Sequence, residues 1–424
     1  MTATTITTSI TMDAVRRRSF REVWVISVGH ALTHWYPATF YILLPLIGNE
    51  LGLDYAQIGS ILTCQYAAGA IANVPGGIYV DTVGRKGLLM AISLCWIGIP
   101  YLIMGASHTY WMILLCATLV GIGNNIWHPT AIPWLGDRFP DRKGLVMSFH
   151  GMGANVGDAV APLVVGWLLA FYSWRSVVVM NVIPGIVVAG VILVYVGRLQ
   201  MADIRSGFAK AKPDKVPAAQ RLRMFGELLR NRALVTLSIG STFRSITQGA
   251  LLTFLPLYLT DVMKYPTRWV GVCLFALQAC GFIAAPIAGH LSDRIGRRQI
   301  IMSSMSMTAV VILAMTFAGG TQWFVLLVAI LGFFLFAVRA VLQAWLLDAT
   351  PPGMGGSAVG ILFGMQALGM AVGPISAGVV ADHYGIMAAF YFLAATIIVA
   401  NLLIFVTPVG LVPAMGKQVE IKPA

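Results

Sequence analysis

The side chains most able to do chemistry in this sequence are ionisable groups placed inside long apolar stretches. They are His30, His34, Asp158, Arg244 and Arg339. Ionisable groups are costly to keep inside a membrane, so each of them is a candidate for function. Histidine titrates near neutral pH and Asp158 is the one carboxylate deep in an apolar stretch, so His34 and Asp158 are candidates to carry a coupled proton. The guanidinium groups of Arg244 and Arg339 stay charged and can bind a carboxylate or phosphonate through paired hydrogen bonds.

The same residues could instead have a structural role. Arginine and histidine can satisfy backbone carbonyls where two helices meet, and Arg244 and Asp158 could pair with each other. A metal site could begin from His30 and His34, which lie four positions apart and share one side of a helix. Two histidines without a paired carboxylate or thiolate are a thin set of ligands, so the sequence predicts no metal site and no cofactor.

The elements that must position these residues are apolar segments long enough to cross a bilayer, which takes about 20 residues. The chain has 424 residues, of which 58% are hydrophobic and 10% are charged, whereas an ordinary soluble domain is about 25% charged. We therefore predict an all-α membrane protein with twelve transmembrane helices. The apolar runs are 22–47, 56–80, 86–106, 110–135, 144–171, 174–197, 233–260, 267–291, 299–318, 322–347, 356–381 and 386–408.

A polar stretch at 198–232, which carries nine Lys and Arg residues, separates the first six runs from the last six. The segment Gly77–Lys86 recurs as Gly289–Arg298, an offset of 212 (289 − 77), and the same offset maps Gly157 onto Gly369. Matches at one offset in separate regions indicate two homologous six-helix halves in parallel orientation, as in one class of secondary transporters. The predicted organisation is a tail, a first half, a linker, a second half and a tail, at 1–21, 22–197, 198–232, 233–408 and 409–424.

The net charge of +12 could indicate a nucleic-acid partner, but the positions of the bases argue against it. Of the 28 Lys and Arg residues, 23 fall before the first run, in the linker, in the tail or in loops on the same side. This asymmetry is the positive-inside pattern of membrane proteins. It predicts a multi-pass protein of the cytoplasmic membrane whose two termini and linker face the cytoplasm.

The repeated segment resembles the loop between the second and third helices of the major facilitator superfamily, which reads G-x-x-x-D-(R/K)-x-G-R-(R/K). The second copy matches throughout, and the first has Thr82 where a base is usual. A carboxylate at a helix end facing arginines can hold one conformation closed and release it in another. The resemblance therefore implies a gating motif, made of Gly77, Asp81, Arg85, Lys86, Gly289, Asp293, Arg294, Arg297 and Arg298.

The resemblance also implies a central cavity lined by the first, fourth, seventh and tenth helices, and all four of the corresponding runs carry polar residues. Glycines 151, 153 and 157, followed by Pro162, are similar to the Gly- and Pro-rich fifth helix of many antiporters in this family. Close packing of such small residues can seal one side of a transporter. The expected cavity residues are His30, His34, Tyr41, Asn124, Asn125, His128, Arg244, Gln248, Arg339 and Gln343.

Narrower features resemble the fosmidomycin-resistance group of drug exporters: the segment Gly29–His34, the Trp127–His128–Pro129 step and Asn155–Gly157. This chain departs from the group with His34 where an acid is usual, and with Asp158 where a small residue is usual. The resemblance implies a monomeric secondary transporter that exports a small drug-like or anionic compound in exchange for protons by alternating access. Import of an organic anion is the alternative, and metal transport a more distant one.

Two other classes of protein fit the sequence poorly. A membrane enzyme would need a clustered nucleophile, metal or acid pair, and the sequence contains no HExxH, GxSxG or Walker motif. A transporter-derived sensor would need a soluble output domain, and the linker 198–232 is too short to form one. We therefore predict that the chain is not an enzyme.

The predicted orientation can be tested with single cysteines in a variant that lacks the five native ones. Lys210→Cys, in the linker, should react with a membrane-impermeant maleimide only after the cells are permeabilised. The matched variant Lys264→Cys lies on the opposite side and should react in intact cells. Labelling of Lys210→Cys in intact cells would overturn the topology.

Overall fold

The computed structural model describes residues 20–83, 85–124, 126–139, 143–205, 226, 228–318, 323–350 and 355–408. The side chains of 73–83 and of several other helical positions are not included in this description. Almost all of the predicted tails, and most of the predicted linker 198–232, therefore lie outside the described residues.

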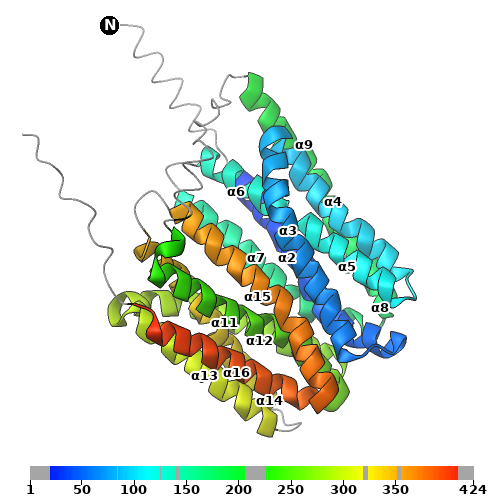
Figure 1. Ribbon diagram of the computed structural model, residues 1–424. Helices are drawn as coiled ribbons and strands as arrows, with labels where there is room; N and C mark the ends of the chain where they lie inside the picture. Colours follow the sequence, from blue (N-terminus) through cyan, green and yellow to red (C-terminus); the bar gives the residue numbers. More distant parts are fainter. Residues whose placement is uncertain are drawn as a thin grey trace, which may run out of the picture. The chain divides into compact units, whose positions relative to one another are not determined.

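The described part of the chain is helical throughout, which confirms the predicted fold class (Figure 1). Ten of the twelve predicted runs each correspond to one helical segment, with a π-helical turn closing the seventh. The first six runs contain α2 Arg21–Leu51, α3 Tyr55–Val83, α4 Lys86–Gly105, α5 Tyr110–Asn124, α6 Trp127–Arg138, α7 Lys143–Leu168, α8 Trp174–Met180 and α9 Val182–Arg205. The others are α11 Arg232–Leu257, η2 Tyr258–Val262, α12 Thr267–Ile295, α13 Arg297–Phe317, α14 Trp323–Asp348, α15 Gly355–Tyr384 and α16 Ile386–Val406.

Two of the predicted runs are each divided between two helices. The run 110–135 forms α5 and α6, and the run 174–197 forms α8 and α9. Pro129 and Pro184 lie just after the two breaks. A proline cannot donate a hydrogen bond to the carbonyl four residues earlier, so Pro184 removes the bond to the carbonyl of Met180, the last residue of α8.

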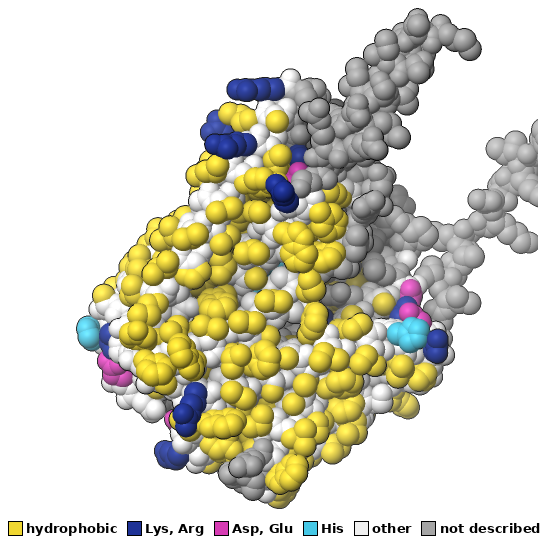
Figure 2. All heavy atoms as spheres, turned by 180° about the vertical axis from the view of Figure 1, so that it is seen from behind, with side chains coloured by type: hydrophobic (Ala, Val, Ile, Leu, Met, Phe, Trp, Pro, Cys, Tyr) yellow, Lys and Arg dark blue, Asp and Glu magenta, His cyan; other side chains and the backbone are white. Residues whose placement is uncertain are grey.

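The surface of the helices is suited to lipid. In Figure 2 hydrophobic side chains cover most of the visible face, and most of the visible Lys and Arg side chains lie toward its edges. Large apolar side chains such as Ile71, Trp111 and Phe317 are strongly exposed. Among the described residues, eight helical segments are long and apolar enough to cross a membrane by hydropathy alone. Helices α2 and α11 are also long enough, but their polar side chains lower their mean hydropathy.

The chain divides into two compact units, Met1–Ala211 with Leu252–Ala279, and Lys212–Leu251 with Cys280–Ala424. In the first unit α2 packs against α7, α3 against α5, and α4 against α9. In the second unit α13 packs against α14 and α16, and α15 also packs against α16. The first unit includes the end of α11 and the start of α12, where the Thr267 hydroxyl lies 3.4 Å from the Gly166 carbonyl oxygen.

The crossing of α2 and α7 is the closest helix contact near the ionisable residues of the first unit. A Cβ atom added at Gly153 would lie 2.3 Å from the carbonyl oxygen of Ser27, and one at Gly157 would lie 2.1 Å from that of Ala31. Real Cβ atoms essentially never approach another atom within 3.0 Å, so only glycine permits this contact. Small residues bring membrane helices together in this way, and here they bring the face of α2 that carries the histidines against α7.

The second unit repeats this contact between α11 and α15. A Cβ atom at Gly369 would lie 2.3 Å from the carbonyl oxygen of Thr242, and one at Gly373 would lie 2.5 Å from that of Ile246. Gly369 is the residue that the offset of 212 relates to Gly157. The internal repeat therefore extends from the sequence to the way in which the helices pack.

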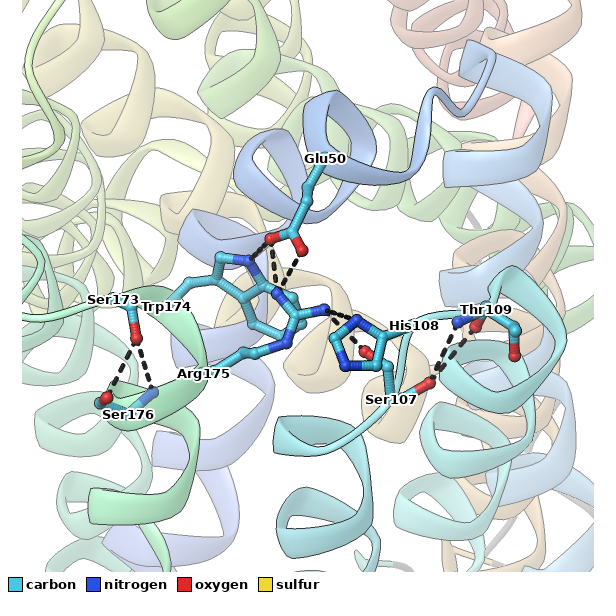
Figure 3. Close-up of polar contacts among 8 residues, drawn as sticks. All are labelled: Glu50, Ser107, His108, Thr109, Ser173, Trp174, Arg175 and Ser176. Atoms are coloured by element: carbon cyan, nitrogen blue, oxygen red, sulfur yellow. Dashed lines mark hydrogen bonds and ion pairs between the residues drawn. The ribbon is translucent and has the colours of Figure 1, made fainter.

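A polar cluster ties the C-terminal end of α2 to the start of α8 and to the loop after α4 (Figure 3). Arg175 Nη1 donates to Glu50 Oε2 at 2.5 Å, and the indole Nε1 of Trp174 donates to the same oxygen at 2.5 Å. Arg175 Nη2 also donates to the Ser107 carbonyl at 2.7 Å and lies 3.1 Å from His108 Nδ1. Glu50 lies beyond the apolar run 22–47, and these donors hold the pKa of its carboxyl below the usual value, Arg175 having the larger effect. The cluster thus stays ionised and joins three segments of the first unit.

The glycine contact can be tested by replacing Gly157 with alanine. The added methyl group must push α2 and α7 apart, and overpacking of this kind costs about 1–3 kcal/mol. We expect Gly157→Ala to lower the melting temperature of the detergent-solubilised protein. Gly151→Ala is the matched control, because a Cβ atom there would have nothing within 4 Å. Equal melting temperatures for the two variants would contradict the packing account.

Candidate functional site

Four histidines and one carboxylate meet in the first unit, and we refer to them as the histidine cluster. Helix α2 contributes His30 and His34, α6 contributes His128, and α7 contributes His150 and Asp158. Their rings contact one another: the His30 centroid lies 4.9 Å from that of His34, 4.9 Å from that of His128 and 3.8 Å from that of His150. The structure therefore brings together residues that are more than 90 positions apart in the chain.

The pair formed by His34 and Asp158 is a partly exposed part of the cluster. His34 Nδ1 lies 3.0 Å from Asp158 Oδ2, and the two side chains are 24% and 25% exposed. The carboxylate accepts a hydrogen bond from the imidazole, and a protonated imidazole would make the pair ionic. Asp158 is therefore oriented by His34 while it remains open to solvent.

His30 is buried, and its hydrogen bonds determine which ring nitrogen carries the proton. His30 Nδ1 lies 2.7 Å from the carbonyl oxygen of His150, which can only accept, so Nδ1 must be the donor. A neutral His30 then has a lone pair on Nε2, which lies 3.0 Å from Nε2 of His128. His128 therefore donates its Nε2 proton to His30. The lone pair of His30 points into the cluster.

His150 is the residue of the cluster whose polar atoms are not satisfied by the described part of the chain. The side chain is 4% exposed, and its ring stacks on that of His30 with an interplanar angle of 7°. Neither ring nitrogen has a hydrogen-bond partner among the described residues. Buried polar atoms are rarely left unpaired, so this position calls for a water molecule, an ion or a ligand.

The remaining candidates of the first unit lie on α2 and α5. Tyr41 is buried, and its hydroxyl hydrogen-bonds that of Tyr66 from α3. Asn124 is half-buried at the end of α5, and its Oδ1 has no partner among the described residues. Asn125 lies outside the described residues. Tyr41 and Asn124 are thus polar groups on the helices that carry or adjoin the cluster.

In the second unit the candidates centre on α11 and α14. Arg244 is buried and donates from Nη2 to the carbonyl oxygen of Leu335 at 2.9 Å. Arg339 is exposed and lies one helical turn after Leu335, so both guanidinium groups belong to the same region of this unit. Gln248 and Gln343 are half-buried. The sequence suggested that Arg244 and Asp158 could pair with each other. In the structure Arg244 donates to the carbonyl oxygen of Leu335, and Asp158 pairs with His34.

The second copy of the gating motif forms a charge network at the junction of α12, α13 and α14. Arg297 Nη1 lies 2.5 Å from Asp293 Oδ1, and its Nε lies 3.2 Å from Asp348 Oδ2. Arg298 donates to the carbonyl oxygen of Phe405, and Arg294 is exposed. In the first copy the side chains of Gly77 and Asp81 lie outside the described residues. Arg85 is exposed there, and Lys86 is half-buried.

Two features of the site escaped the sequence analysis. Glu22 is 1% exposed and forms an ion pair with Arg138, which fastens α6, and with it His128, to the start of α2. The signal for Glu22 was a carboxylate at the start of an apolar run. His150 was left out of the predicted site, although it lies eight positions before Asp158, two helical turns away on the same face of a helix.

Comparisons with known proteins agree with this architecture. Residues 26–285 and 269–420 match the Major Facilitator Superfamily, so the chain belongs to this family and is a multi-pass membrane transporter. The members of the family are transporters, which confirms the expectation that the chain is not an enzyme.

Individual relatives share the length of the chain. The chain is 26% identical over 374 residues to the fosmidomycin resistance protein of Escherichia coli (strain K12), covering 87% of this chain and 88% of that protein. It is 24% identical to a probable 4-methylmuconolactone transporter of Cupriavidus pinatubonensis, covering 86% of this chain and 85% of that protein. A bacterial homologue of the human lysosomal transporter Spinster, in an inward-facing and occupied conformation, superposes with a TM-score of 0.78 at 16% identity, over 92% of this chain and 97% of that one.

Proposed function

We propose that this transporter exports a small drug-like or anionic organic compound in exchange for protons. The observation that carries the proposal is the His34–Asp158 pair, held 3.0 Å apart where α2 crosses α7 and partly exposed to solvent. A carboxylate inside a membrane helix is costly unless it serves a purpose. The similarity to a fosmidomycin resistance protein supports export over import.

The chemistry of the pair suggests how a proton could be coupled to transport. When Asp158 takes up a proton it loses its negative charge and its attraction to a protonated His34. The net charge at the crossing of α2 and α7 is then different. This changes the relative stability of the two conformations that alternate during transport. Release of the proton restores the pair. Coupling of this kind needs only a group that is reachable by water in each conformation in turn.

The anion would be bound by Arg244 and Arg339. Arg244 uses one nitrogen on a backbone carbonyl, and its Nε has no partner among the described residues. Arg339 is exposed one turn from that carbonyl and is free to approach a ligand in the described structure. Guanidinium groups bind carboxylates and phosphonates through paired hydrogen bonds. The polar groups of Gln248 and Gln343, in the same unit, would add contacts to an uncharged part of the substrate.

The halves 22–197 and 233–408 would be the bodies that move, with the gating motifs at Asp81 and Asp293 as switches. The support for this is the internal repeat and the Arg297 network. Import of an organic anion is a second candidate. It is favoured by the same two arginines, which would bind the anionic group.

If Asp158 carries the coupling proton, Asp158→Asn should abolish flux driven by a pH gradient while exchange at equal pH persists, because asparagine cannot take up a proton. His34→Ala should act in the same direction. Flux is measured in proteoliposomes, with fosmidomycin as the first compound to be tested.

Asp54→Asn is the matched control for Asp158→Asn. Asp54 is exposed before α3, where its Oδ1 accepts a hydrogen bond from Gln57 at 2.6 Å, a role that asparagine can also fill. Driven flux should therefore be unchanged in this variant. Undiminished driven flux in Asp158→Asn would remove this residue from the coupling mechanism.

If the two arginines hold an anion, Arg339→Gln and Arg244→Gln should each weaken the binding of organic carboxylates and phosphonates about 10- to 100-fold, because a hydrogen bond to a charged group is lost. Binding of neutral drug-like compounds of similar size should change little. Ligand-induced shifts of the melting temperature measure both.

Arg268→Gln, an exposed position at the start of α12, is the matched control and should bind anions normally. Equal losses for neutral and anionic compounds would indicate a folding defect and would contradict a role in recognising charge. Arg339→Gln is the cleaner variant, because Arg244→Gln also removes the hydrogen bond to Leu335.

A further inference from the structure

We propose that His30, His34 and His128 form a binding site for one divalent transition-metal ion with the ligand preferences of Zn²⁺. One ring nitrogen from each of the three side chains lies within 4.8 Å of the others. Imidazole nitrogen suits zinc and its neighbours in the transition series, whereas Ca²⁺ and Mg²⁺ prefer oxygen ligands. The three imidazole nitrogens therefore favour a transition-metal ion over Ca²⁺ or Mg²⁺ at this position.

The spacing of the nitrogens is close to that of a tetrahedral site. Zinc binds histidine nitrogen at about 2.0–2.1 Å, which places the nitrogens of a tetrahedral site about 3.4 Å apart. The Nε2 atoms of His30 and His128 are 3.0 Å apart and need to separate by only a few tenths of an ångström. As the ion binds, the ring proton of His128 leaves Nε2 and is carried by Nδ1 or released to solvent. The longest separation in the set, 4.8 Å at most, must close by about 1.4 Å, which a small rotation of one imidazole provides.

His30 and His34 already have the outer partners that metal-binding histidines require. His34 Nδ1 is held by Asp158, and His30 Nδ1 is held by the carbonyl oxygen of His150. In metal sites such partners fix the tautomer and the orientation of the ring, and so leave Nε2 for the metal. The Asp158 carboxylate also offsets one of the two positive charges of the ion.

The third ligand, His128, is brought to His30 and His34 by the fold, because it lies far from them in the sequence. His128 comes from α6, and the ion pair of Glu22 with Arg138 ties this helix to α2. A Cβ atom at Gly29 would lie 2.2 Å from the ring of Trp127, so glycine lets the residue before His128 pack closely on α2. The scaffold therefore holds three imidazoles together without a metal.

A fourth position remains for water, for an anionic group or for His150. The ring of His150 is buried against His30, and both of its nitrogens are without a partner among the described residues. Three histidines with one open position are also the arrangement of catalytic zinc sites. The site goes beyond the proposed function, because it requires neither an exported compound nor a proton gradient.

The test is a titration of the purified protein with Co²⁺, without a histidine tag, in detergent at constant pH. Co²⁺ occupies zinc sites and gives strong visible absorption when it is tetrahedral. We expect one equivalent to bind and Zn²⁺ to displace it. His30→Ala and His128→Ala should each weaken binding at least about 100-fold, and Asp158→Asn about 10- to 100-fold.

Of the seven histidines, His290 and His383 lie outside the cluster and provide the matched controls. His290→Ala and His383→Ala should bind Co²⁺ as the unmodified protein does. The inference would be overturned if tetrahedral absorption were absent at millimolar Co²⁺, or if binding survived in His128→Ala. His128→Gln, which retains bulk and polarity, separates loss of a ligand from loss of the fold when its melting temperature is normal.

The result is independent of transport. Failure of Co²⁺ binding would leave proton-coupled export untouched, and failure of proton-driven flux in proteoliposomes would leave the metal site untouched. The two proposals can therefore be judged separately.

Discussion

The backbone contact between α2 and α7 is the interaction on which the candidate site depends. At Gly153 and Gly157 the two helices are so close that a single methyl group would collide with a carbonyl oxygen. Any larger residue would separate the helices and move Asp158 away from His34. In a bilayer this closeness cannot come from a hydrophobic effect between helices, because lipid is equally apolar, so small residues must supply it through packing.

The two halves use one scaffold for different chemistry. Gly369 and Gly373 draw α15 onto α11 as Gly153 and Gly157 draw α7 onto α2. On α11, the carbonyls that they meet belong to Thr242 and Ile246, which the offset of 212 relates to His30 and His34. The titratable cluster therefore exists only in the first unit, among the described residues. In the second unit the charged groups Arg244 and Arg339 lie elsewhere on the scaffold, so titratable groups and permanent cations are separated along the chain.

Hydropathy and the internal repeat were enough to predict the fold, because each membrane helix must satisfy its own backbone and be apolar over a fixed length. They missed the breaks before Pro129 and Pro184, which depend on a few hydrogen bonds and not on composition. In the site, the helical spacing of His30 and His34 was visible in the sequence, but their partners were not. His128 and Asp158 reach them only through the rotation of α6 and α7, and this depends on local contacts such as Gly157 with Ala31 and Glu22 with Arg138.

We propose that Asp158, oriented by His34, takes up and releases a proton in each transport cycle. To test this, proteoliposomes are loaded with the organic anion that binds most strongly and are diluted into anion-free buffer at the same pH. The pH inside the proteoliposomes is then recorded. We expect the interior to become more acidic as the anion leaves, and we expect no such change with Asp158→Asn. Loss of the anion without acidification, or acidification that persists in Asp158→Asn, would contradict it.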